Sequence, residues 1–161
     1  MDEVVIQRSA DAAVLAEIHA AAVAVAYRPF FPADSPPPAA SQLREEWTSK
    51  LADPTAVALL ATVDGRPAGM VLARADRRFP GGEMAGLHVL PAQWGKRIGS
   101  ALHDVALDVL SHAGYDTAWL WVLAANDRAR RMYERRGWSP RADIAQNYLG
   151  VPELRYLRPL A

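Results

Sequence analysis

The sequence predicts one α+β domain, in which an antiparallel meander precedes a strand–helix–strand–helix unit with parallel pairing. Three observations predict this fold. The chain has 161 residues, 51% of them hydrophobic, which is room for one core but not two. Strand-like apolar runs separated by turn signals fill residues 56–89. Beyond Pro91 apolar residues recur at helical spacing, and helical and strand-like segments then alternate.

The N-terminal part reads as a short strand and two helices. The strand is Val4 to Gln7, and Ser9 or Asp11 can cap a helix that runs to about Tyr27. We expect its apolar face to consist of Val14, Leu15, Ile18, Ala22 and Val25. The second helix spans about Ser41 to Leu51. Its apolar residues recur at i, i+4 and i+8, namely Leu43, Trp47 and Leu51.

A proline-rich segment from Pro29 to Pro38 separates these two helices. Proline fixes φ and lacks an N–H, so the segment is expected to be a stiff loop without regular structure. It contains two adjacent aromatic residues, Phe30 and Phe31. They either pack the loop onto the core or line a substrate pocket, and the sequence leaves both readings open.

The central part reads as an antiparallel meander of three strands. Ala56 to Val63 and Pro67 to Ala75 flank Asp64-Gly65, a strong hairpin dipeptide. A turn at 79–82 leads into a strand from about Glu83 to Val89. The alternating unit follows, and its expected elements are a helix from Ile98 to Gly114, a strand from Thr117 to Val122, a helix from Asn126 or Asp127 to Gly137, and strands at Trp138–Asp143 and Glu153–Leu157. No repeat or linker divides the chain, so the domain is expected to span residues 1–161.

Composition and charge narrow the classes of function. Lys plus Arg and Asp plus Glu are equal at 18 each, so no global charge favours nucleic acid or an anionic membrane. No apolar run reaches the roughly 18 residues of a membrane span. The acidic N-terminus, with Asp2 and Glu3, is unlike a signal peptide, and a cytoplasmic location is expected. Without cysteine there are no disulfides or thiolate nucleophiles. The four histidines show no ligand spacing, so no metal site is expected.

The segment from Leu87 to Leu102 carries the first sign of chemistry. A strand ends, glycines allow the backbone to turn, and a helix begins, so unpaired N–H groups and the positive helix end form an anion site. Lys96 and Arg97 add positive charge, and Gly99 lacks a Cβ that would block close approach. The glycine patterns of dinucleotide sites and P-loops are absent. Taken alone, the turn also fits a plain structural role.

Two motifs together resemble the GNAT superfamily of N-acetyltransferases. Its acyl-CoA motif, Q/R-x-x-G-x-G/A, matches residues 94–99, with Trp94 at the Gln/Arg place and Arg97 at the first glycine. We expect Arg97 to have helical dihedral angles, so that its N–H serves as a glycine N–H would. The second motif, N-x-x-A-x-x-x-Y-x-x-x-G-F, begins at Asn126 and ends with Trp138 in place of phenylalanine.

The resemblance covers nearly the whole chain and implies a fold, a donor and a set of contacts. The fold is a mixed, mostly antiparallel sheet of about six to seven strands with a central parallel pair, flanked by about four helices. The donor is acetyl-CoA, with no metal. The residues expected to bind it are Leu87, His88, Val89, Trp94, Gly95, Lys96, Arg97, Ile98, Gly99, Ser100, Asn126, Ala129, Arg130 and Tyr133. For Asn126 the simpler role is that of a helix N-cap, and both roles can hold at once.

The resemblance also implies catalytic residues for direct attack of an amine on the thioester in a ternary complex. Tyr133 is the candidate acid, although a tyrosine at this helical spacing also fits a core role. Glu83 is the candidate base, and a partly exposed carboxylate, or one that only holds the amine, is equally consistent with the sequence. A main-chain N–H near Val89 or Leu90 is expected to meet the oxyanion.

The acceptor is expected to be a primary amine on a small molecule, a peptide or a protein. Neither nucleic acid nor a membrane is expected as a partner, and a homodimer is allowed. An alternative from another class is a domain that binds acyl-CoA as a sensor or structural module without turnover. Retention of the candidate acid, Tyr133, argues against this alternative.

Overall fold

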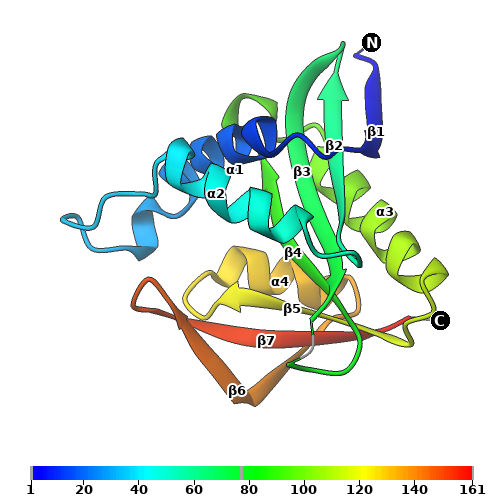
Figure 1. Ribbon diagram of the computed structural model, residues 1–161. Helices are drawn as coiled ribbons and strands as arrows, with labels where there is room; N and C mark the ends of the chain where they lie inside the picture. The colour runs from blue at the N-terminus through cyan, green and yellow to red at the C-terminus, as the bar shows by residue number, and fades with distance from the viewer. Residues whose placement is uncertain (1, 77, 161) are drawn as a thin grey trace.

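The computed structural model of the protein describes residues 2–76 and 78–160 (Figure 1). The strands are β1 (Val4–Arg8), β2 (Val57–Val63), β3 (Arg66–Ala75), β4 (Gly82–Val89), β5 (Thr117–Leu123), β6 (Ser139–Tyr148) and β7 (Val151–Pro159). The α-helices are α1 (Ala12–Ala26), α2 (Ala40–Leu51), α3 (Ile98–His112) and α4 (Asp127–Arg135). Two short 3-10 turns lie at Arg28–Phe30 and Pro91–Gln93. No helix in these ranges is long and apolar enough to cross a membrane.

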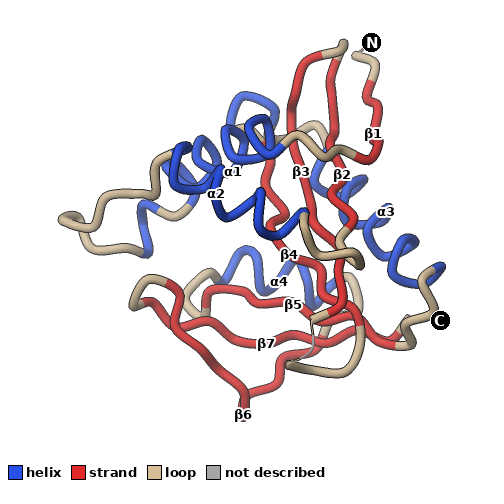
Figure 2. Tube along the Cα trace, in the orientation of Figure 1, coloured by secondary structure: helices blue, strands red, loops and turns tan. Residues whose placement is uncertain are grey.

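The seven strands form one mixed sheet in the order β1-β2-β3-β4-β5-β7-β6. The β4–β5 pair is parallel, and the other neighbouring strands pair antiparallel. Helices α1 and α2 cover one face of the β2–β4 half, and α3 and α4 pack on the opposite face (Figures 1 and 2). The predicted fold class, including the central parallel pair and the four helices, is confirmed.

The parallel pair is short, and this opens the middle of the sheet. Strands β4 and β5 pair only at Gly82–Ala118 and Glu83–Trp119. From there β5 pairs along its length with β7, and the β5–β7–β6 half fans away from β1–β4 (Figure 1). Residues 84–89 of β4 and 120–123 of β5 therefore have no ladder with each other. We call this region the splay.

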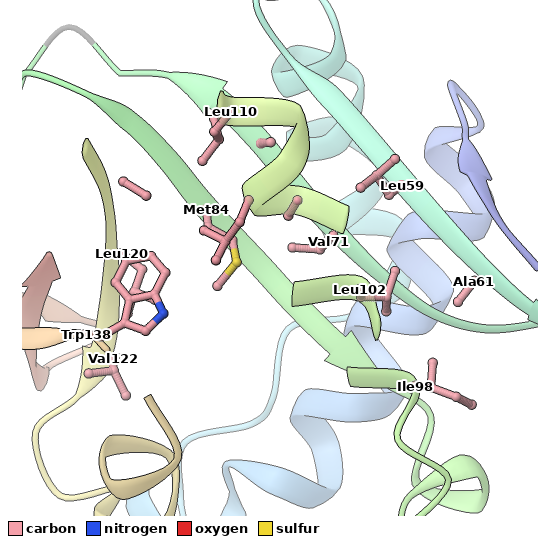
Figure 3. Close-up of a cluster of buried hydrophobic side chains, with 14 of the residues drawn as sticks. Leu59, Ala61, Val71, Met84, Ile98, Leu102, Leu110, Leu120, Val122 and Trp138 are labelled. Atoms are coloured by element: carbon pink, nitrogen blue, oxygen red, sulfur yellow. The ribbon is translucent and has the colours of Figure 1, made fainter. Parts of the chain in front are cut away.

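Two apolar clusters hold the helices to the sheet. The larger lies under α3 and α4 and includes Met84, Leu102 and Trp138 (Figure 3). The smaller lies under α1 and α2 and includes Leu15 and Trp47, both fully buried. Burying a large apolar side chain contributes about 1.5–3 kcal/mol relative to exposure. The two clusters therefore hold the strands that border the splay in place against the helices.

Three details differ from the sequence expectations. Val25 is 50% exposed, and Val23 is buried in its place, because the buried stripe of α1 follows residues 15, 18, 19, 22 and 23. The proline-rich loop begins with a 3-10 turn, since proline fits the first turn of a helix. The last two strands are longer than expected because Leu149 and Gly150, both with positive φ, join β6 to β7 as a tight hairpin.

Candidate active site

A bulge in β4 sets the direction of the main chain along the splay. The β3–β4 register shifts between Met70–His88 and Leu72–Ala85, so Gly86 and Leu87 form the bulge. The Leu90 N–H donates to the Ala68 carbonyl at 2.8 Å. Because successive N–H groups of a regular strand alternate in direction, that of Val89 faces away from β3, toward the splay.

The expectation that the Leu90 N–H could meet an oxyanion is wrong, because that group already bonds to β3. The Val89 carbonyl is also occupied, since the Trp94 indole Nε1 donates to it at 2.8 Å. This bond folds the loop after β4 back onto the strand end. Trp94, at the place where the family motif has Gln or Arg, thus has a positioning contact within the protein, although its ring stays 47% exposed.

The turn after β4 presents a run of unpaired amides. In the described part of the chain, the N–H groups of residues 95–100 donate to no protein acceptor. Gly95 and Arg97 both have positive φ, 82° and 62°, and alternating left-handed residues form concave anion-binding nests. The expectation of helical dihedrals at Arg97 is therefore wrong. This residue holds the left-handed conformation that glycine has in the commoner motif, at a cost of about 1–2 kcal/mol.

Gly99 lies in the first turn of α3, where glycine is not required by the fold. A Cβ at this position would meet only the Val89 side chain, at an ordinary 3.6 Å. Glycine inside a helix costs about 0.5–1 kcal/mol relative to alanine. A close ligand would explain the glycine, whereas packing does not. Ile98 beside it is buried and anchors the turn to the core.

Two basic side chains, those of Arg136 and Lys96, make contacts at this turn, whereas a third, Arg130, binds elsewhere. The Arg136 guanidinium donates to Ser100 Oγ at 2.7 Å and to Asp104, and nothing in the sequence distinguishes it from the other arginines of residues 128–136. Lys96 contacts Gln93 and Asp2. Arg130 instead donates to the Tyr156 hydroxyl and the Ala124 carbonyl. No residue of the turn binds Arg130, so the structure does not bring this predicted phosphate contact to the site.

The start of α4 borders the other side of the splay. Asn126 is the N-cap, and its Oδ1 accepts from the Ala129 N–H at 3.2 Å. Its amide NH₂ group donates to no partner in residues 2–76 and 78–160. The two readings of Asn126 are therefore compatible, because the oxygen caps the helix while the nitrogen stays available.

Tyr133 is half-buried, and its ring packs on the larger core cluster, 5.9 Å from the Trp138 ring. Its hydroxyl makes no hydrogen bond to any described residue. Burial raises the pKa of Tyr133 to about 12, partly offset by the positive charge of Arg136. The phenol thus keeps its proton at working pH, and the ring has both a packing role and a free donor.

Glu83 lies at the last paired position before the splay. Its side chain is buried, 3% exposed, and accepts from Arg74 Nε at 2.7 Å. The reading of Glu83 as a partly exposed carboxylate is therefore wrong. An ion pair at this depth needs good geometry to offset the lost hydration of both groups.

A second carboxylate, Glu153, is not distinguished by any sequence motif. It is half-buried opposite Leu123 at the end of β5, and it accepts from Gln146 Nε2 at 2.8 Å. Burial raises the pKa of the Glu153 carboxyl; the hydrogen bond from Gln146 opposes this rise, and the charge of Glu83 adds to it. A lone glutamate in a strand has no sequence signature, so only the fold brings it near Glu83.

An aromatic cluster lies on the same face. The Tyr27 ring, at the end of α1, contacts those of Phe31, His88 and Tyr148 at 5.8–6.3 Å. Burial raises the pKa of Tyr27, and the nearby Tyr133 and Glu153 raise it further. Phe31 is half-buried in this cluster, so it packs the proline-rich loop and also borders the site.

The His88 side chain stacks on His19 of α1 at 4.3 Å. It therefore points toward α1, and the main chain of His88 pairs with Met70 of β3, so the structure does not bring this predicted contact into the splay. Two open hollows of about 420 and 470 Å³ lie beside α2 and β3, and Arg74 lines both. They do not contain the turn at residues 95–100. Arg74, which lines both hollows, connects them to the site because it also pairs with Glu83.

Comparison with known proteins agrees with this arrangement. The sequence model of the acetyltransferase (GNAT) family matches residues 20–138. A mycothiol acetyltransferase from Beutenbergia cavernae is 45% identical over 71 residues, which make up 44% of this chain and 23% of that protein. The match thus spans less than a quarter of that relative's length.

Solved structures share the fold. PaiA N-acetyltransferase from Thermoplasma acidophilum, in complex with coenzyme A, superposes with a TM-score of 0.75 at 16% identity, over 98% of this chain and 99% of that one. The ribosomal-protein-S18-alanine N-acetyltransferase from Escherichia coli gives 0.71 at 18% identity, over 100% and 95%. The chain therefore belongs to the GNAT family of acetyltransferases.

Proposed function

We propose that this protein transfers the acetyl group of acetyl-CoA directly to a primary amine while both substrates are bound. The observation that carries the proposal is the end of the β4–β5 ladder at Glu83–Trp119, combined with a turn beyond the end of β4, at residues 95–100, whose six amides have no partner among the described residues. A strand edge without a partner can accept an extended amide chain such as pantetheine. A nest of amides at a helix start binds diphosphate.

The cofactor contacts follow from the free groups of the site. The amides of residues 95–100 hold the diphosphate, and Arg136 adds positive charge beside Ser100. The NH₂ group of Asn126 donates to a pantetheine carbonyl. The Leu87 N–H, at the bulge, meets the thioester oxygen, with Val89 as the next donor along the strand.

The reaction forms an amide bond and breaks the thioester C–S bond. The neutral amine attacks the carbonyl carbon, the oxyanion collapses, and the thiolate of coenzyme A departs. An amine that arrives as an ammonium ion loses two protons from its nitrogen: one before the attack, which passes through the base to solvent, and one after it, which ends on the sulfur. The chain has no cysteine to form a cysteinyl thioester, and direct transfer in one ternary complex is the most economical scheme.

The carboxylates of Glu83 and Glu153 have different roles toward the amine. Glu83 is bound by Arg74 and serves to orient the ammonium group of the acceptor. Glu153, whose pKa is raised by burial, is the better proton acceptor, because a base becomes more effective as its pKa approaches the operating pH. Free amines with a pKa near 10.4 arrive protonated and need such a base.

Tyr133 stabilises the departing thiolate of coenzyme A. With a pKa of about 12, it stays protonated, and its hydroxyl donates a hydrogen bond to the sulfur as negative charge develops there. Complete transfer from such a phenol to a thiolate of pKa about 8.5 is uphill. The hydrogen bond is therefore the main contribution of Tyr133, and the final proton on sulfur comes from the amine through the site.

Calorimetry and an amine screen test the proposal together. Acetyl-CoA should bind and raise the melting temperature, through mass action on the folded state. Release of free thiol should then depend on an added primary amine. If acetyl-CoA produced neither binding heat nor a melting shift, the splay and turn would not be a cofactor site.

A further inference from the structure

On the face of the sheet that carries Glu83, one buried cation, Arg155, has no ion-pair partner within residues 2–76 and 78–160. Side chains of a strand alternate between faces. Leu120 and Val122 face the core under α3 and α4, so Trp119 and Trp121 face the other side. In the ladders Glu83 lies opposite Trp119, and Arg155 lies opposite Trp121. Glu83 and Arg155 therefore share this face, two strands apart.

Arg155 is 5% exposed, and its Nε has no hydrogen-bond partner within residues 2–76 and 78–160. No carboxylate there lies within ion-pair distance of it. Other arginines on or beside this face are paired, Arg74 with Glu83, Arg78 with Asp76 and Arg141 with Asp143. The described residues thus leave a buried guanidinium without an ion-pair partner, which is costly unless a ligand supplies one.

The surroundings of Arg155 supply rings and donors. Phe79 stacks on the guanidinium, with Cζ 3.9 Å from the ring centroid, and Trp119 lies at 5.2 Å. The indole Nε1 atoms of Trp119 and Trp121 are buried without partners among the described residues. Stacking compensates the face of the cation but provides no acceptor for its N–H groups. A cluster with three unsatisfied donors and no acceptor is complementary to an anion.

We propose that Arg155 binds an anionic group, a carboxylate or a phosphate, carried by the amine acceptor. Its guanidinium edge makes the charge-assisted contact, and Phe79 and the two tryptophans exclude water around it. Two strand spacings and two residues separate Glu83 from Arg155, or about 11–12 Å between Cα atoms. The acceptor therefore carries its anionic group several bonds from the amine. This inference rests on the proposed function.

A matched set of six-carbon amines tests the assignment in the full-length protein. Hexylamine has a neutral end, 1,6-diaminohexane a second cation, and 6-aminohexanoate and 6-aminohexyl phosphate an anionic end. The acetylated product is quantified for each at fixed acetyl-CoA. We expect kcat/KM for at least one anionic acceptor to exceed that for hexylamine by about tenfold or more. The two anionic acceptors distinguish carboxylate from phosphate.

Arg155→Met should lower kcat/KM for the preferred anionic acceptor about 10- to 100-fold and leave hexylamine within about twofold. Arg155→Lys should keep part of the preference. Arg141→Met is the matched control, because it removes a neighbouring exposed positive charge that is paired with Asp143. An equal loss for hexylamine in Arg155→Met, or a wild-type preference for hexylamine or the diamine, would overturn the assignment.

Different results would reject the proposed N-acetylation and the proposed anion site at Arg155. Acetylation of hexylamine without any preference for anionic acceptors rejects the Arg155 site and leaves N-acetylation intact. If no amine is acetylated, the proposed function is rejected, and binding of the anionic amines then tests the Arg155 site separately. In that case 6-aminohexanoate or 6-aminohexyl phosphate should still raise the melting temperature of wild type but not of Arg155→Met. No shift in wild type would reject the site.

Discussion

The Nε atom of Arg74 lies 2.7 Å from Oε1 of Glu83, a carboxylate that is 3% exposed at the last rung of the β4–β5 ladder. The ion pair ties β3 to β4 where the sheet begins to open. It also keeps a buried negative charge at the point where the splay begins.

Glu83→Gln tests the orienting role. The amide cannot pair with the guanidinium, so we expect the free energy of unfolding to fall by about 1–3 kcal/mol. The catalytic deficit should appear mainly in the KM of the amine and persist at every pH. A pH-rate profile with a range of amine concentrations checks this. A deficit that vanished at high pH would make Glu83 the base instead.

Glu153→Gln tests the base. If Glu153 takes the proton, kcat/KM should fall about 10²- to 10⁴-fold near neutral pH, and the deficit should shrink as pH rises, since more of the amine is then already neutral. Gln146→Ala removes only the hydrogen bond that opposes the raised pKa of Glu153 and is the matched control. A deficit independent of pH would leave Glu153 with a structural role.

Tyr133→Phe separates the donor from the ring. The phenyl ring still packs against Trp138, so the melting temperature and the affinity for acetyl-CoA should change little. Loss of the hydroxyl should lower kcat by roughly 10- to 1,000-fold. Steady-state kinetics with a saturating amine provides the measurement. Turnover near the wild-type value would assign Tyr133 to the core alone.

Gly99→Ala and Gly99→Asp probe the turn. The added Cβ of alanine meets only Val89 at 3.6 Å, so Gly99→Ala should fold normally, with equal or slightly higher stability, and bind acetyl-CoA more weakly. Gly99→Asp adds a negative charge against the diphosphate and should weaken binding severely. Calorimetric titration compares both with wild type. Undiminished affinity in Gly99→Asp would place the diphosphate elsewhere.

Arg97→Gly replaces a left-handed arginine at φ 62° by a residue without that conformational cost. Relief of strain and greater freedom of the unfolded chain oppose each other, so stability should change by no more than about 1 kcal/mol. Acetyl-CoA affinity should be unchanged or modestly higher. A large loss of affinity would mean that the guanidinium of Arg97, rather than its N–H, binds the phosphates.

Two buried histidines make stability sensitive to acid. His19 Nδ1 accepts from Trp47 Nε1 at 3.1 Å, and His103 Nε2 accepts from Trp138 Nε1 at 3.0 Å. Burial lowers the pKa of His19 to about 4 and also lowers that of His103. Each imidazole must therefore stay neutral to accept its indole N–H.

Below pH 6.5 the histidines of the unfolded chain bind protons, whereas His19 and His103 of the folded chain stay neutral to lower pH. Stability should be complete above about pH 6.5 and decline as the pH falls toward 4, with His19 alone contributing about 3 kcal/mol. Urea unfolding across this range gives the measurement. His19→Gln should flatten the decline, and His112→Gln, at an exposed position, should not. A slope that His19→Gln leaves unchanged would contradict this origin.

The fold could be predicted from local patterns because each element has its own signal. Asp64-Gly65 marks the first hairpin, and Asn126 caps α4 as its residue type suggests. The two motif blocks located the turn and Tyr133. What the sequence could not show depends on tertiary placement. The dihedral angle of Arg97 follows from the path of the loop, and the occupied N–H of Leu90 follows from the register with β3.

The acceptor side was least predictable for the same reason. Glu153 and Arg155 are ordinary strand residues in the sequence, and only the β5–β7 ladder places them beside Leu123 and Trp121. The raised pKa of Glu153 follows from its burial, and the anion site proposed at Arg155 follows from burial without a hydrogen-bond partner for Nε among the described residues. Neither burial nor the lack of a partner can be recognised from neighbouring residues in the sequence.

A single-turnover reaction with acetyl-labelled acetyl-CoA tests the central claim most directly. Excess protein is mixed with the labelled donor and a primary amine, the reaction is quenched at short times, and label is measured on the amine and on the protein. We predict that label passes to the amine as thiol is released, with no acetylated protein at any time. Binding of acetyl-CoA without transfer to any amine, as a sensor would show, or accumulation of an acetylated protein, would contradict the account.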